Sequence, residues 1–335
     1  MENVFSPKIK LFYNDYNVYN DFSPYLQGIT YNDFLEDECD ELIIQLRDDD
    51  KLFQNHWYPQ KGAKLKCSIS DGEEVLNCGT FTIDSINYQF DENGNTLNIR
   101  AIAATTLLPL RTHRSDYYEK TTVPMIAKKI ADRHGLEFFT NEIFSNDFLT
   151  VDRITQTEES DLGFLRRLSK EYGYVFKLTD NLLSFIKIYD KGSVFSLDKS
   201  WFASLNFDDT SVKKYKGGQI NYYNPEKKSL QTVNIGDTSG DILKMRKKFT
   251  SHAQGLEIIN SQIKNLSKEL KGTVALKRPL GNFISGVNFN IKGFGVFDGK
   301  YEIKKTTHKI TDSYWSVKGE IERIENLNPL NLFNK

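Results

Sequence analysis

The sequence predicts a mainly β protein that carries an α/β insertion, and three observations indicate this fold class. Apolar and polar residues alternate through much of the first hundred residues and again from 286 to 324, as they do in half-buried strands. Apolar residues recur at helical spacing in the middle third. The two ends also resemble each other when the sequence is shifted by 220 positions, which predicts one small β-domain occurring twice.

Composition narrows the functional classes. Among 335 residues, 44 Lys and Arg nearly cancel 45 Asp and Glu, whereas a nucleic-acid binder normally needs a basic face. We interpret the one basic cluster, 244–248, as a solvated face beside a helix. Three cysteines without a C-x-x-C motif indicate neither a disulfide framework nor a zinc knuckle. The N-terminus lacks an apolar signal region, so we expect a cytosolic protein without membrane insertion.

The first predicted elements are strands. Segments 41–46, 64–69 and 79–86 combine β-branched residues with period-two alternation. Residues 91–94 read Asp-Glu-Asn-Gly, and Asn-Gly accepts the positive φ angles of a tight hairpin. We therefore expect the strands on either side of 91–94 to pair.

Two helices follow in the middle third. The first begins at Thr122 as N-cap, with Pro124 in the first turn, and ends at Gly135. The second carries Leu162, Leu165, Leu168 and Tyr172 on one face and ends at Gly173, with a strand at 174–178.

The last third contains one clear helix between predicted strands. Strands are expected at 201–207 and 219–223, and more strands at 286–324. Between them, segment 252–271 has apolar residues spaced three and four apart, at Leu256, Ile259, Ile263, Leu266 and Leu270. Because two heptads are too short for an independent coiled coil, we expect this helix to lie on the outside of a sheet.

The internal similarity extends over several strands. Shifted by 220 positions, 79–83 lies over 299–303, Phe90 over Ile310 and Leu97 over Val317. Upstream, 62–67 lies over 286–291 at a shift of 224.

Signatures of catalysis are weak. The five histidines form no H-E-x-x-H motif, and neither a nucleophile elbow nor a phosphate-binding loop is present. Glu158, Glu159 and Asp161 open the second helix, where the helix dipole favours acidic residues without any reaction. We therefore assign no catalytic, cofactor-binding or metal-binding residue, and we expect no cofactor.

One segment resembles a known family. Residues 156–168, QTEESDLGFLRRL, followed by EYGY at 171–174, closely resemble a segment of phage late control protein D. That family comprises the baseplate hubs of contractile tails, is related to the N-terminal part of VgrG, and includes hubs of defective prophages and phage-tail-like bacteriocins. Further agreement, in order along the chain, lies at Trp57–Pro59, Gly62, Gly79–Phe81, Thr121–Pro124, Gly135–Leu136, Pro279–Gly281, Gly286, Gly293, Asp298–Tyr301, His308 and Tyr314–Trp315.

The resemblance implies two tube-like β-barrels, at 1–110 and 193–335, that flank an inserted α/β domain at 111–192, with helix 252–271 packed on the second barrel. It further implies a homotrimer whose six barrels join a six-fold tail tube to a three-fold central spike. The implied partners are the spike, tail tube, tape-measure and other baseplate proteins, and not nucleic acid. Assembly would take place in the bacterial cytoplasm, before the hub enters the baseplate. The chain ends after the second predicted barrel, so we expect the spike to be a separate protein.

Two other functions stay open. A tail-associated enzyme that degrades peptidoglycan would need only two carboxylates brought together by the fold, and Glu158, Glu159 and Asp161 are the candidates. A sugar-binding β protein would instead use some of the 17 tyrosines.

Overall fold

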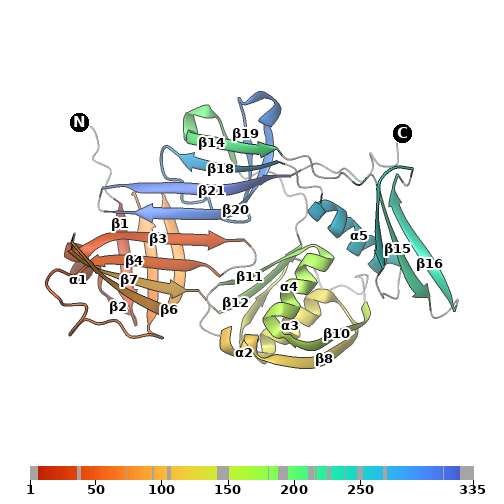
Figure 1. Cartoon of the computed structure of the whole chain (residues 1–335), viewed down its shortest axis with the longest axis horizontal. Coiled ribbons are helices and arrows are strands. Elements are labelled where there is room, and N and C mark those ends of the chain that lie inside the picture. The colour runs from red at the N-terminus through yellow and green to blue at the C-terminus, as the bar shows by residue number, and fades with distance from the viewer. Residues whose placement is uncertain are drawn as a thin grey trace.

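A computed structural model describes most of the chain, and it is mainly β, as the sequence predicted (Figure 1). No helix within the described residues combines the length and apolar content needed to cross a bilayer. The described residues are 7–35, 39–72, 74–92, 94–103, 107–141, 151–179, 181–187, 195–209, 215, 217–224, 228–237, 239–246, 252–266, 270–311 and 313–324.

The first β unit is antiparallel, with the strand order β3-β4-β7-β6-β5-β1. Alternate residues of each strand point into one core, so Leu42, Ile44 and Leu46 of β4 are buried. Strands β6 and β7 pair out to Asp91 and Gly94, which confirms the predicted hairpin. The elements are β1 (Lys8–Tyr13), β2 (Tyr16–Asn17), α1 (Tyr19–Phe22), the 3-10 turn Ser23–Tyr25, β3 (Leu26–Phe34), β4 (Glu41–Arg47), β5 (Lys64–Ser70), β6 (Val75–Asp91) and β7 (Gly94–Ile102).

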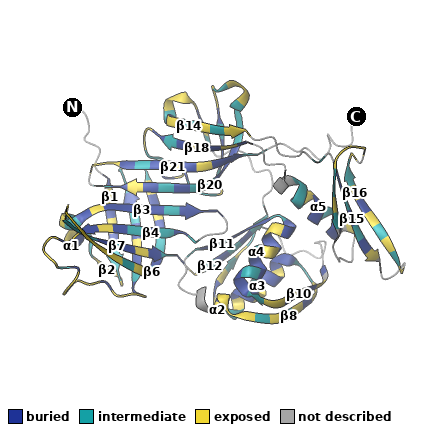
Figure 2. Cartoon of the chain, in the orientation of Figure 1, coloured by how far each residue is buried: buried dark blue, intermediate teal, exposed yellow. Residues whose placement is uncertain are grey.

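The second β unit repeats this order as β14-β18-β21-β20-β19-β13, and we refer to the two β units as the first and the second barrel. Its elements are β13 (Phe195–Leu197), the 3-10 turn Lys199–Trp201, β14 (Phe202–Asp209), β18 (Leu270–Leu276), β19 (Asn288–Ile291), the 3-10 turn Gly295–Phe297, β20 (Gly299–Ile310) and β21 (Trp315–Arg323). Figure 1 shows this unit stacked on the first, with β20 running beside β3. That pairing joins both units into one thirteen-stranded sheet with a continuous apolar core (Figure 2).

The inserted α/β unit has its own core and ends its helices as predicted. The Thr122 hydroxyl accepts a hydrogen bond from the Met125 N–H, the Ser160 hydroxyl accepts one from Gly163, and Gly173 adopts a φ of 70°. The elements are α2 (Leu107–Arg111), β8 (His113–Thr121), α3 (Val123–Arg133), β9 (Glu137–Phe139), β10 (Val151–Ser160), α4 (Asp161–Tyr172), β11 (Tyr174–Thr179) and β12 (Leu182–Lys187).

The last helix differs from the prediction in its extent. It is described as α5 (His252–Leu266), and Leu270 begins strand β18 instead of extending the helix to residue 271. The reason is the alternation of β18, in which Leu270, Gly272, Val274 and Leu276 are all buried in the barrel core. The spacing of Leu270 therefore fits a helix and a strand equally well.

The packing partner of α5 also differs from the prediction. Instead of lying on the second barrel, α5 packs between α4 and a small sheet of β15 (Gly217–Asn224), β16 (Ser229–Gly236) and β17 (Ile242–Arg246) (Figure 1). Ile258 and Ile259 are buried in the core of the α/β unit. The Gln254 amide donates to the Tyr172 hydroxyl at 2.7 Å, and the Ser261 hydroxyl donates to the Lys170 carbonyl at 3.2 Å.

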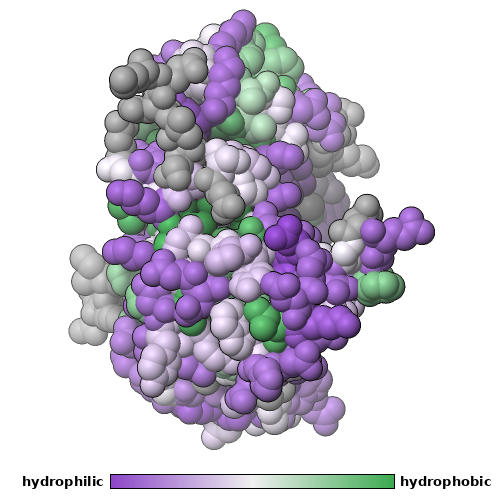
Figure 3. Space-filling model, turned by 90° about the vertical axis from the view of Figure 1, so that its left-hand side faces the viewer, coloured by the Kyte–Doolittle hydropathy of each residue, from purple (hydrophilic) through white to green (hydrophobic). Residues whose placement is uncertain are grey.

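The surface is predominantly polar. Figure 3 shows the end that lies at the left of Figure 1 as mainly hydrophilic, with hydrophobic side chains in small groups. In the basic cluster 244–248, Lys244 is exposed on strand β17, which contacts helix α5. Residues 247 and 248 lie outside the described part of the chain.

Candidate functional site

The acidic start of α4 is a closed ion-pair cluster. Asp161 is fully buried, and its carboxylate accepts hydrogen bonds from Arg133 at 3.1 Å and Gln156 at 2.9 Å. His134 Nε2 lies 2.7 Å from the same carboxylate, and Arg114 lies 3.5 Å away. Burial by itself would raise the pKa of Asp161, but these hydrogen bonds and arginine charges outweigh it and hold the pKa below its ordinary value.

The two neighbouring glutamates are also held in place by the fold. Glu159 pairs with Arg167 at 3.0 Å, and the backbone N–H of Glu158 donates to the Ser115 hydroxyl within a bulge of β10. A carboxylic acid that protonates a leaving group needs a raised pKa, whereas that of Asp161 is lowered. The structure therefore does not assemble the candidate carboxylates into an acid–base pair.

Across the described residues, no group of three or more His, Cys, Asp or Glu side chains is placed to hold a metal ion. His134 is the C-cap of α3 and contacts Asp161, while His308 is buried in β20. His56, His113 and His252 are exposed.

A half-buried lysine joins three parts of the fold and was not found from the sequence. Lys177 of β11 donates to the carboxylate of Asp33 in β3 and, at 3.1 Å, to the Ser285 hydroxyl of the second barrel. It also lies 3.2 Å from the Asp40 carboxylate. Lys177 thus ties the α/β unit to the junction of the two barrels. The sequence feature that could have indicated this cluster is a lysine within the otherwise apolar run 174–178.

The two aspartates beside Lys177 respond differently to burial. Burial raises the pKa of Asp40 to about 7, although Lys177 acts in the opposite direction. Burial would also raise the pKa of Asp33, but the charge and hydrogen bond of Lys177, together with Ser285, lower it below its ordinary value. The Ser285 N–H donates to Asp33 at 2.7 Å. The ionised Asp33–Lys177 pair is therefore the centre of the cluster.

The joint between the barrels is an antiparallel pairing of β3 with β20. Tyr31 lies directly opposite His308, and Ile29 opposite Ile310. These side chains are buried, whereas Thr307 and Asn32, on the opposite sheet face, are joined by a hydrogen bond of 2.7 Å. The joint thus combines an apolar face, a polar face and backbone pairing.

The two barrels share strand registers and bulges, although β13 runs parallel to β19 whereas β1 runs antiparallel to β5. Cys67 lies opposite Gly79 in the first, and Ile291 lies opposite Gly299 in the second, at the positions that the sequence shifts predicted. The bulges recur as well, between Ile83 and Ser85 of β6 and between Ile303 and Lys305 of β20. They recur also in the first strand of each unit, at 26–28 of β3 and 202–204 of β14. A bulge is a defined local feature, so its recurrence in two places establishes a shared architecture.

The two barrels nevertheless differ in surface charge. In the first, Arg100 pairs with Glu41 at 2.7 Å and Asp84 at 3.1 Å. The equivalent positions of the second barrel carry the opposite charges. Glu320 corresponds to Arg100, Lys271 to Glu41 and Lys304 to Asp84.

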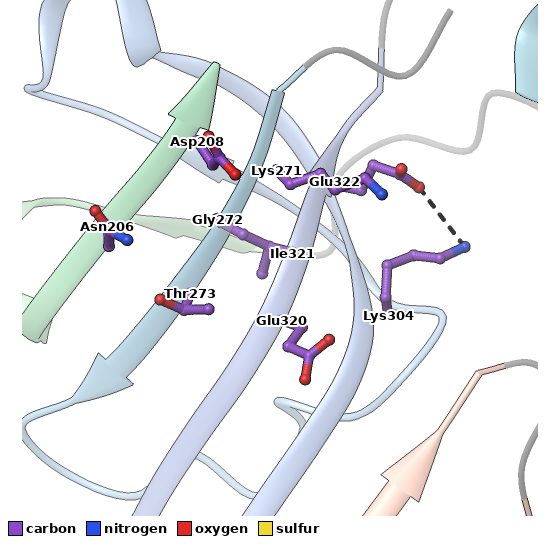
Figure 4. A pocket seen from close by; sticks show the side chains of 9 residues that line it. All are labelled: Asn206, Asp208, Lys271, Gly272, Thr273, Lys304, Glu320, Ile321 and Glu322. Carbon is purple, nitrogen blue, oxygen red and sulfur yellow. Dashed lines mark ion pairs between the residues drawn. The ribbon is translucent and has the colours of Figure 1, made fainter. Parts of the chain in front are cut away.

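These charged residues surround an open hollow of about 430 Å³ on the second barrel (Figure 4). In it, Lys304 points toward Glu322, with 4.0 Å between the charged atoms. Its full lining is Asn206, Asp208, Lys271, Gly272, Thr273, Lys304, Glu320, Ile321 and Glu322. Because its lining carries charges of both signs and is open to water, the hollow suits a hydrated surface and not an apolar ligand.

The fold itself is shared with solved proteins. The tail protein from Neisseria meningitidis MC58 has the same fold, with a TM-score of 0.71 over 95% of this chain and 97% of that one, at 10% identity. A Francisella PdpA–VgrG complex superposes with a TM-score of 0.54 over 97% of this chain and 54% of that one, also at 10% identity. At such identities the likeness concerns the fold.

The family likeness is more specific. Residues 45–187 match the family of the phage tail baseplate hub (GPD), so the resemblance found at 156–174 is confirmed. A probable baseplate hub protein of Escherichia phage 186 is 30% identical over 183 residues, which are 54% of this chain and 45% of that protein. The chain therefore spans less than half of that relative.

Proposed function

We propose that this chain is the structural baseplate hub of a contractile phage tail or tail-like particle. The observation that carries the proposal is one barrel repeated within one chain and joined to its copy through β3 and β20. Three such chains offer six similar positions to a six-fold tail tube and three identical positions to a three-fold spike. The match of residues 45–187 to the baseplate hub family supports the same function.

In this proposal the hub acts by binding. Its partners are two further copies of the chain, the tail tube protein, the central spike protein, and other baseplate and tape-measure proteins. It assembles in the bacterial cytoplasm and then resides in the baseplate. Support for a role without catalysis comes from Glu159 and Asp161, which are engaged in ion pairs with arginines.

Native mass tests the proposal. The full chain is measured alone and after mixing with the candidate spike protein encoded beside it, and the spike alone is the control. We expect a species of three times 38.7 kDa in at least one sample, with the mass of the spike added in the mixture. A monomer in both samples would contradict the trimeric hub.

A further inference from the structure

One strand edge of the first barrel pairs with none of the described strands, although its equivalent in the second barrel is paired. In β20, residues 305–310 pair with β21 on one side and with β3 on the other. In β6, residues 85–90 pair with β7 on one side, and no described strand pairs with them on the other. The position beside residues 85–90 of β6, which corresponds to that of β3 beside β20, is therefore not filled by a described strand.

The side chains along this edge have the character of a covered joint. Phe90 is 80% exposed and Tyr88 is 38% exposed, whereas the equivalent Ile310 and His308 are fully buried beneath β3. A row of exposed aromatic residues beside unpaired backbone groups invites another strand.

The strand that matches this edge is β14, which lies at the other end of the same sheet. Strand β14 is the equivalent of β3, because both stand first in the strand order of their β unit and both carry a bulge near their start. Strand β3 pairs with β4 and β20, whereas β14 pairs with β18 alone among the described strands. Two complementary free edges at opposite ends of one sheet form a head-to-tail contact between copies.

We propose that β14 of one copy pairs antiparallel with residues 85–90 of β6 in the next copy, in the register of the β3–β20 joint. Transferring that register places Phe90 opposite Leu205, Tyr88 opposite Phe207, and Asn87 opposite Asp208. This inference deepens the proposed hub function, because it names the strands that close the ring.

The transferred register sorts the side chains by face. Leu205 and Phe207 are half-buried on the core side of β14, where Phe90 and Tyr88 would continue the apolar core. Asn87 and Asp208 are exposed on the opposite face. They occupy the places of Thr307 and Asn32, which are hydrogen-bonded in the internal joint. The Asn87 amide can donate to the Asp208 carboxylate, so both faces of the joint are satisfied. A slip by one residue would set apolar side chains against polar ones.

Cysteine cross-linking of the full chain tests the register. We expect Asn87→Cys combined with Asp208→Cys to give covalent oligomers in multiples of 38.7 kDa on mild oxidation. The matched control combines Asn87→Cys with Asn206→Cys, which lies on the same face but two residues away, and should cross-link far less. The unaltered chain, with Cys39, Cys67 and Cys78, gives the background.

A charge exchange gives an independent readout. Asn87→Asp sets two carboxylates opposite each other, and we expect self-association to weaken about tenfold. Adding Asp208→Asn restores an amide–carboxylate pair and should recover most of the loss. Asn77→Asp, on β6 outside the proposed joint, should have no effect.

The outcomes separate the register from the hub function. A trimer by native mass that cross-links only through the control pair would overturn the register and leave the hub standing. Oligomers unaffected by Asn87→Asp would overturn it as well. A chain that is monomeric both alone and with the spike would overturn both proposals.

Discussion

Tyr31 of the first barrel and His308 of the second are stacked, with their ring centroids 6.0 Å apart, and lie directly opposite each other across the β3–β20 joint. The His308 ring also accepts a hydrogen bond from the Trp315 indole N–H at 3.2 Å, and its other nitrogen lies 3.2 Å from the Phe283 carbonyl. This buried imidazole is therefore fixed by both of its nitrogens at the centre of the molecule.

Buried, neutral His308 makes a contribution to stability that we expect to be lost in mild acid. Burial lowers its pKa from 6.5 to about 4. The unfolded chain therefore binds a proton more readily than the folded one, and the stabilisation by neutral His308 falls as pH drops from 6.5 towards 4. Between pH 7 and pH 5 we expect this residue to cost about 2 kcal/mol of unfolding free energy, measured by urea denaturation. Asp40, whose pKa burial raises to about 7, gains stability over the same pH interval, so the test is the difference in unfolding free energy between the natural chain and His308→Gln. From pH 7 to pH 5 this difference should shift by about 2 kcal/mol in favour of the variant, and an unchanged difference would contradict the prediction.

Removal of Lys177 should destabilise the junction of the three parts. Lys177→Met leaves Asp33 and Asp40 buried without a counter-charge, and we expect a loss of about 3 kcal/mol in unfolding free energy. Lys128→Met is the control, because Lys128 forms an exposed pair with Asp132 that should contribute less than about 1 kcal/mol. Adding Asp33→Asn to Lys177→Met should recover part of the loss. Equal losses for Lys177→Met and the control would refute the proposed tie.

The acidic start of α4 separates the hub from a peptidoglycan-degrading enzyme. We expect neither the natural chain nor the combined variant Glu158→Gln, Glu159→Gln, Asp161→Asn to digest cell walls in a zymogram that includes a known lysozyme. The variant should lose about 1–3 kcal/mol of stability, because Asp161 is buried among hydrogen-bond donors. Digestion by the natural chain that disappears in the folded variant would favour the enzyme.

The contact between α5 and β15 can be tested at one glycine. A Cβ on Gly218 would lie 2.5 Å from Ile259 Cδ1, so Gly218→Ala forces the helix away from its sheet. We expect a loss of about 1–3 kcal/mol in thermal or chemical unfolding. In the background of Ile259→Ala the same glycine change should cost much less, since the two closest clashing atoms are gone and only Ile263 Cδ1, at 3.0 Å, remains. Additive losses would show that the two residues are not in contact.

Local signals explain why much of the fold was predictable. The ends of α3 and α4 depend on Thr122, Ser160 and Gly173, whose roles are decided within a few residues. Strand alternation is equally local. The match between 79–83 and 299–303 succeeded because register and bulge are repeated together.

Long-range choices were not predictable from the same patterns. The apolar stripe of α5 indicates that some surface covers it, but the choice of α4 and β15 depends on the glycine at 218 facing Ile259. Leu270 suits a helical stripe and a buried strand alike. Lys177 meets Asp33 and Ser285 from positions more than 100 residues away, so local spacing carries no trace of the cluster.

Because two similar barrels belong to one chain, the number of barrels in a closed ring is constrained. Any closed ring of such chains contains an even number of barrels, so a five-membered or seven-membered ring cannot form from intact chains. Half of the joints, those made by β3 and β20, are completed when each chain folds and do not depend on its concentration. An error in ring size would therefore have to add or remove two barrels at once, which restricts the symmetry of the particle before any partner binds.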